Sequence, residues 1–480
     1  MNKPIRTLNL FDTVMLVSGS MIGSGIFIVS ADMSRSLGSP FWVLMCWILS
    51  GLITLFAALS YGELAGMMPE AGGQFVYLKR AFGKLTAFVY GWTVFLVIQT
   101  GVIAAVAVAF AKFTGVFIEF FDEKNVLLEI GAFKLKSAQI LAIASIALLT
   151  WLNTRGVQNG KSIQRIFTSA KLIALFGLII LGIFFGLKYD TFSQNFSGSW
   201  TPFQTKVVDG IVTTSPLEGF TFFGIMCAAM IGALFSSDAW NNVTFIAGEV
   251  QEPQKNIPLG LFIGTCIVTV IYILANLAYF MLLPVKGDPN AADVVGQGIM
   301  FAQNDRVGTA ALFVVFGNIS KYIMAALIMV STFGCNNGLI LQGSRLFQSM
   351  AVNDLFFKKA GILNEHGVPA NASVYQAVWA SILCLSGSYG DLLDYCTFAS
   401  LLFYLVTILG IFILRKKEPN AERPYKAFGY PIIPAAYILL CGFICVNLLI
   451  YKTFNCGMGV LIIALGIPVF YMINNKKQNG

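Results

Sequence analysis

Long apolar stretches separated by short polar connections run through almost the whole chain. A helix needs about 20 apolar residues to cross the hydrocarbon core of a bilayer, so the pattern predicts about twelve spanning helices. They are expected at residues 10–35, 41–66, 86–113, 138–154, 164–187, 219–247, 258–284, 308–342, 372–388, 391–414, 431–451 and 457–474. The ninth and tenth are nearly continuous, so a count of about eleven fits the pattern as well. The fold class that the pattern indicates is an all-α integral membrane protein.

The middle of the first expected span is the glycine-rich segment Ile22-Gly23-Ser24-Gly25-Ile26. Each glycine weakens a helix by about 1 kcal/mol relative to alanine, and glycine allows the backbone to approach a ligand closely. Backbone that unwinds at membrane depth needs protein, water or ligand as its hydrogen-bonding partner, because lipid offers none. The segment indicates either a broken helix with a binding site or a close packing contact with a neighbouring helix.

The sixth expected span carries a polar run between two apolar segments. The run is Phe235-Ser236-Ser237-Asp238-Ala239-Trp240-Asn241-Asn242. Serine, aspartate and asparagine side chains compete with a helical backbone for hydrogen bonds. An aspartate at the centre of a span costs about 2.5–3.5 kcal/mol on insertion scales, so its presence indicates a function.

The two interruptions correspond if helices one to five and six to ten are repeats of each other. Interrupted helices at matching places in two halves are the best sequence indication of a transporter binding site. Free N–H groups at the start of a half-helix suit a carboxylate, whereas free carbonyls and Asp238 suit an ammonium group. The pair of breaks therefore fits an amino acid zwitterion.

The expected repeats divide the chain into four parts. Residues 1–187 form the first five-helix repeat, 188–218 an extracellular loop, 219–414 the second repeat, and 415–480 helices eleven and twelve with a cytoplasmic tail. An even number of spans places both termini on one side of the membrane. Lysine and arginine are more numerous in the connections on that side, which predicts that both termini are cytoplasmic.

Composition agrees with a membrane protein, because 57% of the residues are hydrophobic and only 11% are charged. A soluble domain is about 25% charged. The net charge of +8 is explained by topology, and no basic stretch is interleaved with aromatic residues, so no nucleic-acid partner is expected. The nine cysteines and one histidine form no CxxC pair or ligand cluster, so we expect no metal, no other cofactor and no disulfide framework. No constellation of an enzyme embedded in the membrane is present, and an enzyme is not expected.

Several motifs resemble those of one known superfamily. They are Gly23-Ser24-Gly25-Ile26-Phe27, Tyr61-Gly62-Glu63-Leu64, Pro69-Glu70-Ala71-Gly72-Gly73-Gln74-Phe75-Val76-Tyr77, Phe167-Thr168-Ser169-Ala170-Lys171-Leu172, Asp238-Ala239-Trp240-Asn241-Asn242 and Ser331-Thr332-Phe333-Gly334-Cys335-Asn336-Asn337-Gly338. Together they are similar to the amino acid–polyamine–organocation superfamily, and to a bacterial group within its L-type amino acid transporter branch. The resemblance covers roughly residues 10–415 in the expected order.

The resemblance implies the leucine-transporter fold, in which two inverted five-helix repeats carry broken helices one and six. It implies that backbone from Ile22 to Ile26 holds the substrate carboxylate. It further implies that carbonyls from Phe235 to Asp238 hold the amino group, with Phe235 as the outer gate.

The resemblance also implies a substitute for sodium. In this branch a lysine on helix five, here Lys171, is thought to supply the charge that a cation supplies in sodium-coupled relatives. It would bond toward the unwound first helix and a helix-eight hydroxyl such as Ser331. The alternative is that Lys171 extends its ammonium group to the cytoplasmic face.

This chain departs from the branch in three places. Ala239 stands where glycine is usual, and Ser237 where an aromatic residue is frequent. The loop at residues 114–137 lacks the cysteine by which animal members bind a glycoprotein heavy chain, so no such partner is expected.

The expected function is sodium-independent transport of amino acids across the plasma membrane by alternating access. A bacterial inner membrane is the expected location. Neutral L-amino acids are favoured, and both exchange and proton coupling are open. Asp238 matches an aspartate of a dibasic-amino-acid carrier, which leaves a cationic amino acid or polyamine carrier as the alternative. A nutrient receptor built on a transporter fold is a further alternative, from another functional class.

Overall fold

The computed structural model describes residues 6–122, 124–131, 133–208, 211–385 and 389–478. Within these residues ten helices are long and apolar enough to cross a membrane. They are α3 (Pro40–Met67), α5–α6 (Lys84–Thr114), α7 (Ser137–Thr154), α8 (Val157–Gly186), α10–η4 (Gly219–Glu249), α11 (Pro253–Leu282), α13–α14 (Val307–Val352), α16 (Tyr389–Lys417), α17 (Ile432–Tyr451) and α18 (Thr453–Gln478). Two shorter apolar helices are α1 (Leu10–Met21) and α15 (Ala370–Leu385). Every expected span overlaps one of these segments, so the predicted all-α membrane fold is confirmed.

The first and sixth spans are both interrupted, as the sequence predicts. The first consists of α1, a short 3₁₀ segment η1 (Gly25–Phe27) and α2 (Val29–Leu37). The sixth consists of α10 (Gly219–Ser236) and the 3₁₀ helix η4 (Trp240–Glu249). In the third span, a π-helical turn η2 (Val94–Ile98) separates α5 (Lys84–Thr93) from α6 (Gln99–Thr114).

The fifth span begins at Val157, before the residue 164 expected from hydropathy. Its first turns carry Lys161, a charge that lies before the expected start, and Arg165. Both side chains pair with Asp12 of α1, Lys161 at 2.8 Å. These ion pairs hold the start of α8 against α1.

The connections contain small elements that an apolar pattern does not reveal. β1 (Val126–Ile130) pairs antiparallel with β2 (Phe133–Lys136), and β3 (Phe203–Val208) with β4 (Ile211–Pro216). The short helices of the connections are α4 (Gln74–Phe82), η3 (Glu119–Phe121), α9 (Thr191–Phe196), α12 (Val294–Gln297), η5 (Gln303–Asp305) and η7 (Lys358–Gly361). Within the segment Val307–Val352, α13 (Val307–Phe316) and η6 (Gly317–Ile319) precede α14. The junction expected between the ninth and tenth spans includes residues 386–388, which lie outside the described residues.

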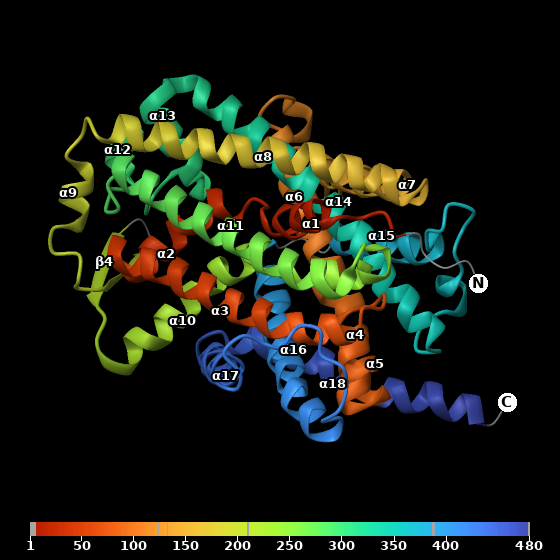
Figure 1. The fold of residues 1–480 in the computed structure, drawn as a ribbon. Helices are drawn as coiled ribbons and strands as arrows, with labels where there is room; N and C mark the ends of the chain where they lie inside the picture. The colour runs from red at the N-terminus through yellow and green to blue at the C-terminus, as the bar shows by residue number, and fades with distance from the viewer. Residues whose placement is uncertain (1–5, 123, 132, 209–210, 386–388, 479–480) are drawn as a thin grey trace.

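The broken helices lie inside the bundle. α1 packs against α8, α11 and α14 (Ser320–Val352), and η4 packs against α3, α11 and α14. Figure 1 shows α17 and α18 at one side of the bundle, where both contact α16. Of these two helices, α17 also packs against α10 and so lies next to the interrupted sixth span.

Candidate functional site

The two helix breaks lie directly against each other. A Cβ atom placed on Gly25 would overlap the side chain of Ser236. The hydroxyl of Tyr272, on α11, donates to the carbonyl of Met21 at 3.3 Å and to that of Ser236 at 2.9 Å. One tyrosine therefore bonds to the last turn of both α1 and α10.

The first break exposes backbone groups that a continuous helix would pair. After Met21 the backbone of Ile22 is extended, with φ −78° and ψ 100°. Ile22, Ser24, Gly25 and Ile26 are buried, whereas Gly23 is partly exposed. A Cβ atom on Gly23 would meet nothing closer than the Cys335 Sγ atom at 3.8 Å. A Cβ atom therefore fits beside the backbone of Gly23 in ordinary van der Waals contact.

Lys171 reaches this break from the middle of α8. Its side chain is buried, with 2% of the residue exposed, and Nζ donates to the carbonyls of Gly19 at 2.6 Å and Ile22 at 2.7 Å. A third bond of 3.3 Å reaches the Ser331 carbonyl. The Ser331 hydroxyl donates to the carbonyls of Ile22 at 3.2 Å and Gly23 at 3.0 Å. The ammonium group therefore ends inside the bundle, and the alternative in which it extends to the cytoplasmic face is wrong.

The second break turns at Ala239. This residue has φ 63° and ψ 7°, in the left-handed region where glycine is normally preferred. Ala239, which stands where glycine is usual in the branch, is thus the residue of this break that has a positive φ. Ser236 and Ser237 are buried, and the Ser236 hydroxyl donates a 2.7 Å hydrogen bond to the Gly232 carbonyl. Phe235 is partly buried and packs against the cluster that contains Cys335 and Leu339.

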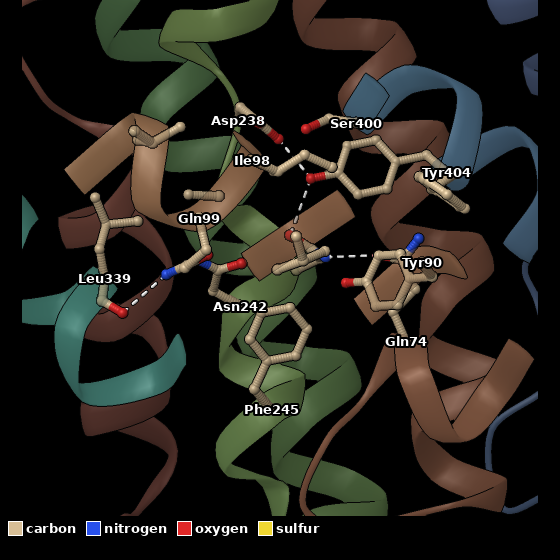
Figure 2. Close-up of a pocket in the computed structure, with 15 residues that line it drawn as sticks. Gln74, Tyr90, Ile98, Gln99, Asp238, Asn242, Phe245, Leu339, Ser400 and Tyr404 are labelled. Carbon is tan, nitrogen blue, oxygen red and sulfur yellow. Dashed lines mark hydrogen bonds between the residues drawn. The ribbon is translucent and has the colours of Figure 1, made fainter. Parts of the chain in front are cut away.

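The Asp238 carboxylate points toward Tyr404 and Ser400, into a polar network (Figure 2). The Tyr404 hydroxyl, from α16, lies 2.5 Å from the Asp238 carboxylate and 3.0 Å from the Asn241 amide oxygen. The Asn241 amide donates to Gln74 at 3.0 Å, and the Gln74 amide donates to Thr407 at 2.9 Å. These bonds join η4, α4 and α16 next to the break.

Two cavities meet at Asp238. One lies between α5–α6, η4, α14 and α16, and Gln99, Asn242 and Tyr404 are among its polar lining residues. The other is lined by Ser237, Asp238 and Tyr404 among others. Each has room for about one water molecule, so a ligand the size of an amino acid requires the cavity to widen.

Gln74, Gln99 and Tyr272 belong to this site, although the sequence motifs do not assign them a role. Each is a polar or partly polar side chain that is almost fully buried, in a chain where apolar residues dominate. A polar residue inside an apolar span is the signal that marks Gln99. Nothing in the pattern reveals which distant segment such a side chain meets. Within the described residues no group of three or more histidine, cysteine, aspartate or glutamate side chains is placed to hold a metal.

Comparison with known proteins agrees with this architecture. The model of the amino acid permease family matches residues 8–473. The mouse large neutral amino acids transporter small subunit 2 is 28% identical, covering 97% of this chain and 81% of the relative. Human Asc-type amino acid transporter 1 is also 28% identical, over 97% and 82%. The serine/threonine exchanger SteT of Bacillus subtilis (strain 168) is 26% identical, over 99% and 98%. The chain belongs to the amino acid permease family, and it is a multi-pass membrane transporter rather than an enzyme.

Proposed function

We propose that the protein is a sodium-independent transporter of neutral L-amino acids that works by alternating access around the two helix breaks. The observation that carries the proposal is the position of Lys171, whose ammonium group bonds to three carbonyls between α1 and α14. A fixed positive charge at this point removes the need for a bound cation. Exchange and proton-coupled uptake are both compatible with it.

The proposed substrate contacts follow from the backbone at each break. N–H groups between Gly23 and Ile26 bind the α-carboxylate, because the Ile22 N–H already donates to the Ser18 carbonyl at 3.0 Å. The room for a Cβ atom beside Gly23 supports this placement. Carbonyls from Phe235 to Asp238 bind the α-ammonium, and Phe235 closes the site from outside. The cavity lined by Gln99 and Asn242 then receives the side chain. Its amide and hydroxyl groups favour a neutral side chain.

The two-repeat organisation proposed from the sequence is supported by reciprocal packing. The contact of α1 with α11 corresponds to that of η4 with α3, and the contact of α8 with α11 corresponds to that of α16 with α3. The contact of α8 with α14 corresponds to that of α16 with α6, and the contact of α7 with α14 corresponds to that of α15 with α6. In each comparison, both helices are replaced by their counterparts in the other repeat. A transporter built this way alternates by moving one set of helices against the other.

We place the protein in the plasma membrane, in a bacterial inner membrane, with both termini cytoplasmic. It acts without a disulfide-linked heavy chain, because loop 114–137 has no cysteine and none of the nine cysteines is exposed. Eight are buried and Cys266 is partly buried. A disulfide to another chain needs an accessible thiol.

A cationic amino acid or polyamine is the second candidate substrate, and one observation favours it. The Asp238 carboxylate lines both central cavities, and no lysine or arginine is among the described residues that line them. A panel of unlabelled amino acids and polyamines competing for uptake into proteoliposomes tests both candidates. Competition by neutral L-amino acids alone supports the main proposal. Competition by lysine, arginine or polyamines supports the second.

Replacing Asp238 with asparagine separates the two roles of this carboxylate. If the Asp238 carboxylate binds a cationic side chain, uptake of cationic substrates should fall by about tenfold or more, because one charge-assisted hydrogen bond is lost. Uptake of neutral substrates should then be retained. An equal loss of uptake for cationic and neutral substrates would contradict binding of a cationic side chain by Asp238. The measurement is the ratio of the two uptake rates in Asp238→Asn relative to the wild-type protein.

Replacing Tyr404 with phenylalanine is expected to raise the KM for neutral substrates by about tenfold. The change removes the hydroxyl that bonds to Asp238 and Asn241, and a hydrogen bond to a charged group contributes about 1.5–3 kcal/mol. Tyr189→Phe is the matched control, because it removes an exposed tyrosine hydroxyl that lines neither central cavity. An unchanged KM in Tyr404→Phe would show that the network does not shape the site.

A further inference from the structure

A third cavity, of about 400 Å³, lies beside the second half of the broken sixth span. Its lining includes Arg6, Glu70, Glu249, Arg345 and Gln348, and we call it the vestibule. Glu70 and Val352, which also line it, are exposed, so the vestibule reaches the surface on the face that carries Arg6.

Neighbouring residues of η4 line the vestibule and the central cavity that Gln99 and Asn242 also line. Phe245 of η4 is 1% exposed and lines the central cavity, and the next residue, Ile246, lines the vestibule. The Phe245 carbonyl also accepts a 2.9 Å bond from the Gly72 N–H. A substrate that leaves the central cavity past Phe245 therefore enters the vestibule.

The wall of the vestibule holds a buried ion pair with unused hydrogen-bonding capacity. Arg345 Nε lies 2.5 Å from Glu249 Oε1, and the two side chains are only 3% and 5% exposed. Nη1 and Nη2 of Arg345 and Oε2 of Glu249 are buried without a hydrogen-bond partner. A buried polar atom without a partner costs about 1–3 kcal/mol, and more when it is charged. A ligand that supplies the missing partners is therefore stabilised here.

The chemistry of the unpaired atoms identifies the class of ligand. The two Nη atoms of a guanidinium form a planar fork that matches a carboxylate, and the adjacent carboxylate oxygen accepts from an ammonium group. The charged residues that line the vestibule are Arg6 and Arg345, balanced by Glu70 and Glu249. This balance disfavours a simple anion or cation and suits a zwitterion.

We propose that Arg345 and Glu249 form a second amino acid site in the vestibule, which the substrate occupies between the central cavity and the solution. Arg345 binds the α-carboxylate and Glu249 the α-ammonium. The proposal rests on the function proposed above. It assigns the pair a binding role on one face of the membrane only.

A purely structural role for the same pair makes the opposite prediction. The backbone carbonyl of Glu249 also accepts hydrogen bonds from the N–H groups of Thr7 and Leu8, both at 3.0 Å. The Arg345–Glu249 pair is therefore part of a contact that closes this face. Loosening a closing contact populates the state open to the vestibule, which lowers the KM measured from that face and raises it from the other. Loss of a binding site raises the KM on the vestibule face alone.

The test measures the KM from each face in right-side-out and inside-out membrane vesicles. The probe is the labelled neutral L-amino acid that the competition panel selects. Arg345→Lys keeps the charge and the ion pair but removes the fork, and it is expected to raise the KM on the vestibule face by about tenfold. The KM on the opposite face should stay within about twofold. Arg80→Lys is the matched control, because Arg80 forms a 2.5 Å ion pair with Glu418 and does not line the vestibule.

Glu249→Gln provides a second variant, since it keeps a hydrogen bond to Arg345 and loses the charge that attracts an ammonium. It is expected to raise the KM on the same face. An unchanged KM on both faces in a folded variant, or a fall on the vestibule face, would overturn the second site. Absence of uptake by the wild-type protein in both preparations would instead refute the proposed function.

Discussion

Replacing Lys171 with methionine is expected to reduce sodium-free amino acid uptake by about 100-fold or more. Hydrogen bonds to a charged group contribute about 1.5–3 kcal/mol each, and 100-fold corresponds to about 2.8 kcal/mol. Nζ bonds to the carbonyls of Gly19 and Ile22 at 2.6 and 2.7 Å. Methionine fills a similar volume but removes both bonds, so the Gly19 carbonyl loses its Nζ partner in a region where lipid offers none. The Ile22 carbonyl keeps only the 3.2 Å bond from the Ser331 hydroxyl. The measurement is the initial uptake rate in proteoliposomes that contain equal amounts of folded protein.

Two further variants make the result specific to this position. Lys188→Met removes an exposed lysine just beyond α8, whose ammonium lies 4.9 Å from the ring centroid of Phe185, and it should transport normally. Ser331→Ala removes the hydroxyl bonds to Ile22 and Gly23 and should give a smaller loss, about tenfold. If folded Lys171→Met transports within a few-fold of the wild-type rate, Lys171 does not replace a cation.

Replacing Gly25 with alanine is expected to force the two helix breaks apart. The added Cβ atom would overlap Ser236 Oγ and lie 2.9 Å from Ser236 Cβ. Overpacking of this kind costs about 1–3 kcal/mol, and here it acts where both half-helices bind the substrate. We expect a lower thermal unfolding midpoint in detergent and a loss of uptake of about tenfold or more.

The glycine two residues earlier and a second-site change provide the controls. Gly23→Ala should leave the unfolding midpoint unchanged, because its Cβ would meet only Cys335 Sγ, at 3.8 Å. Ser236→Gly removes both side-chain atoms that the new Cβ atom of Gly25→Ala would meet, and leaves the Ser236 Cα at an ordinary 3.5 Å. The double variant should therefore recover stability relative to Gly25→Ala alone. A single Gly25→Ala variant as stable and active as the wild type would contradict close contact between the breaks.

The helices and their interruptions could be predicted because both depend on local sequence. Runs of apolar residues specify spans in lipid, and Gly23, Gly25 and the polar run from Ser236 to Asn242 weaken a helix wherever they occur. Hydropathy places the start of α8 too late because Lys161 is neutralised by Asp12, a residue more than a hundred positions away. A hydropathy pattern cannot include a charge whose partner lies in another helix.

The side chains that complete the site were much harder to predict. Tyr272, Gln74 and Tyr404 act through contacts with segments distant in sequence, and their residue types alone do not specify a partner. Lys171 is the exception, because a lone lysine inside an apolar span requires a partner or an exit to the surface. The sequence leaves those two outcomes open, and only the fold places Nζ against the first break.

Uptake of labelled neutral L-amino acids into sodium-free proteoliposomes tests the central claim most directly. Vesicles with and without unlabelled amino acid inside, each with and without a proton gradient, are compared with vesicles in sodium buffer. We expect uptake without sodium, driven by internal amino acid or by the proton gradient, and no further stimulation by sodium. Uptake that requires sodium, or no uptake of any amino acid by folded protein, would contradict the account.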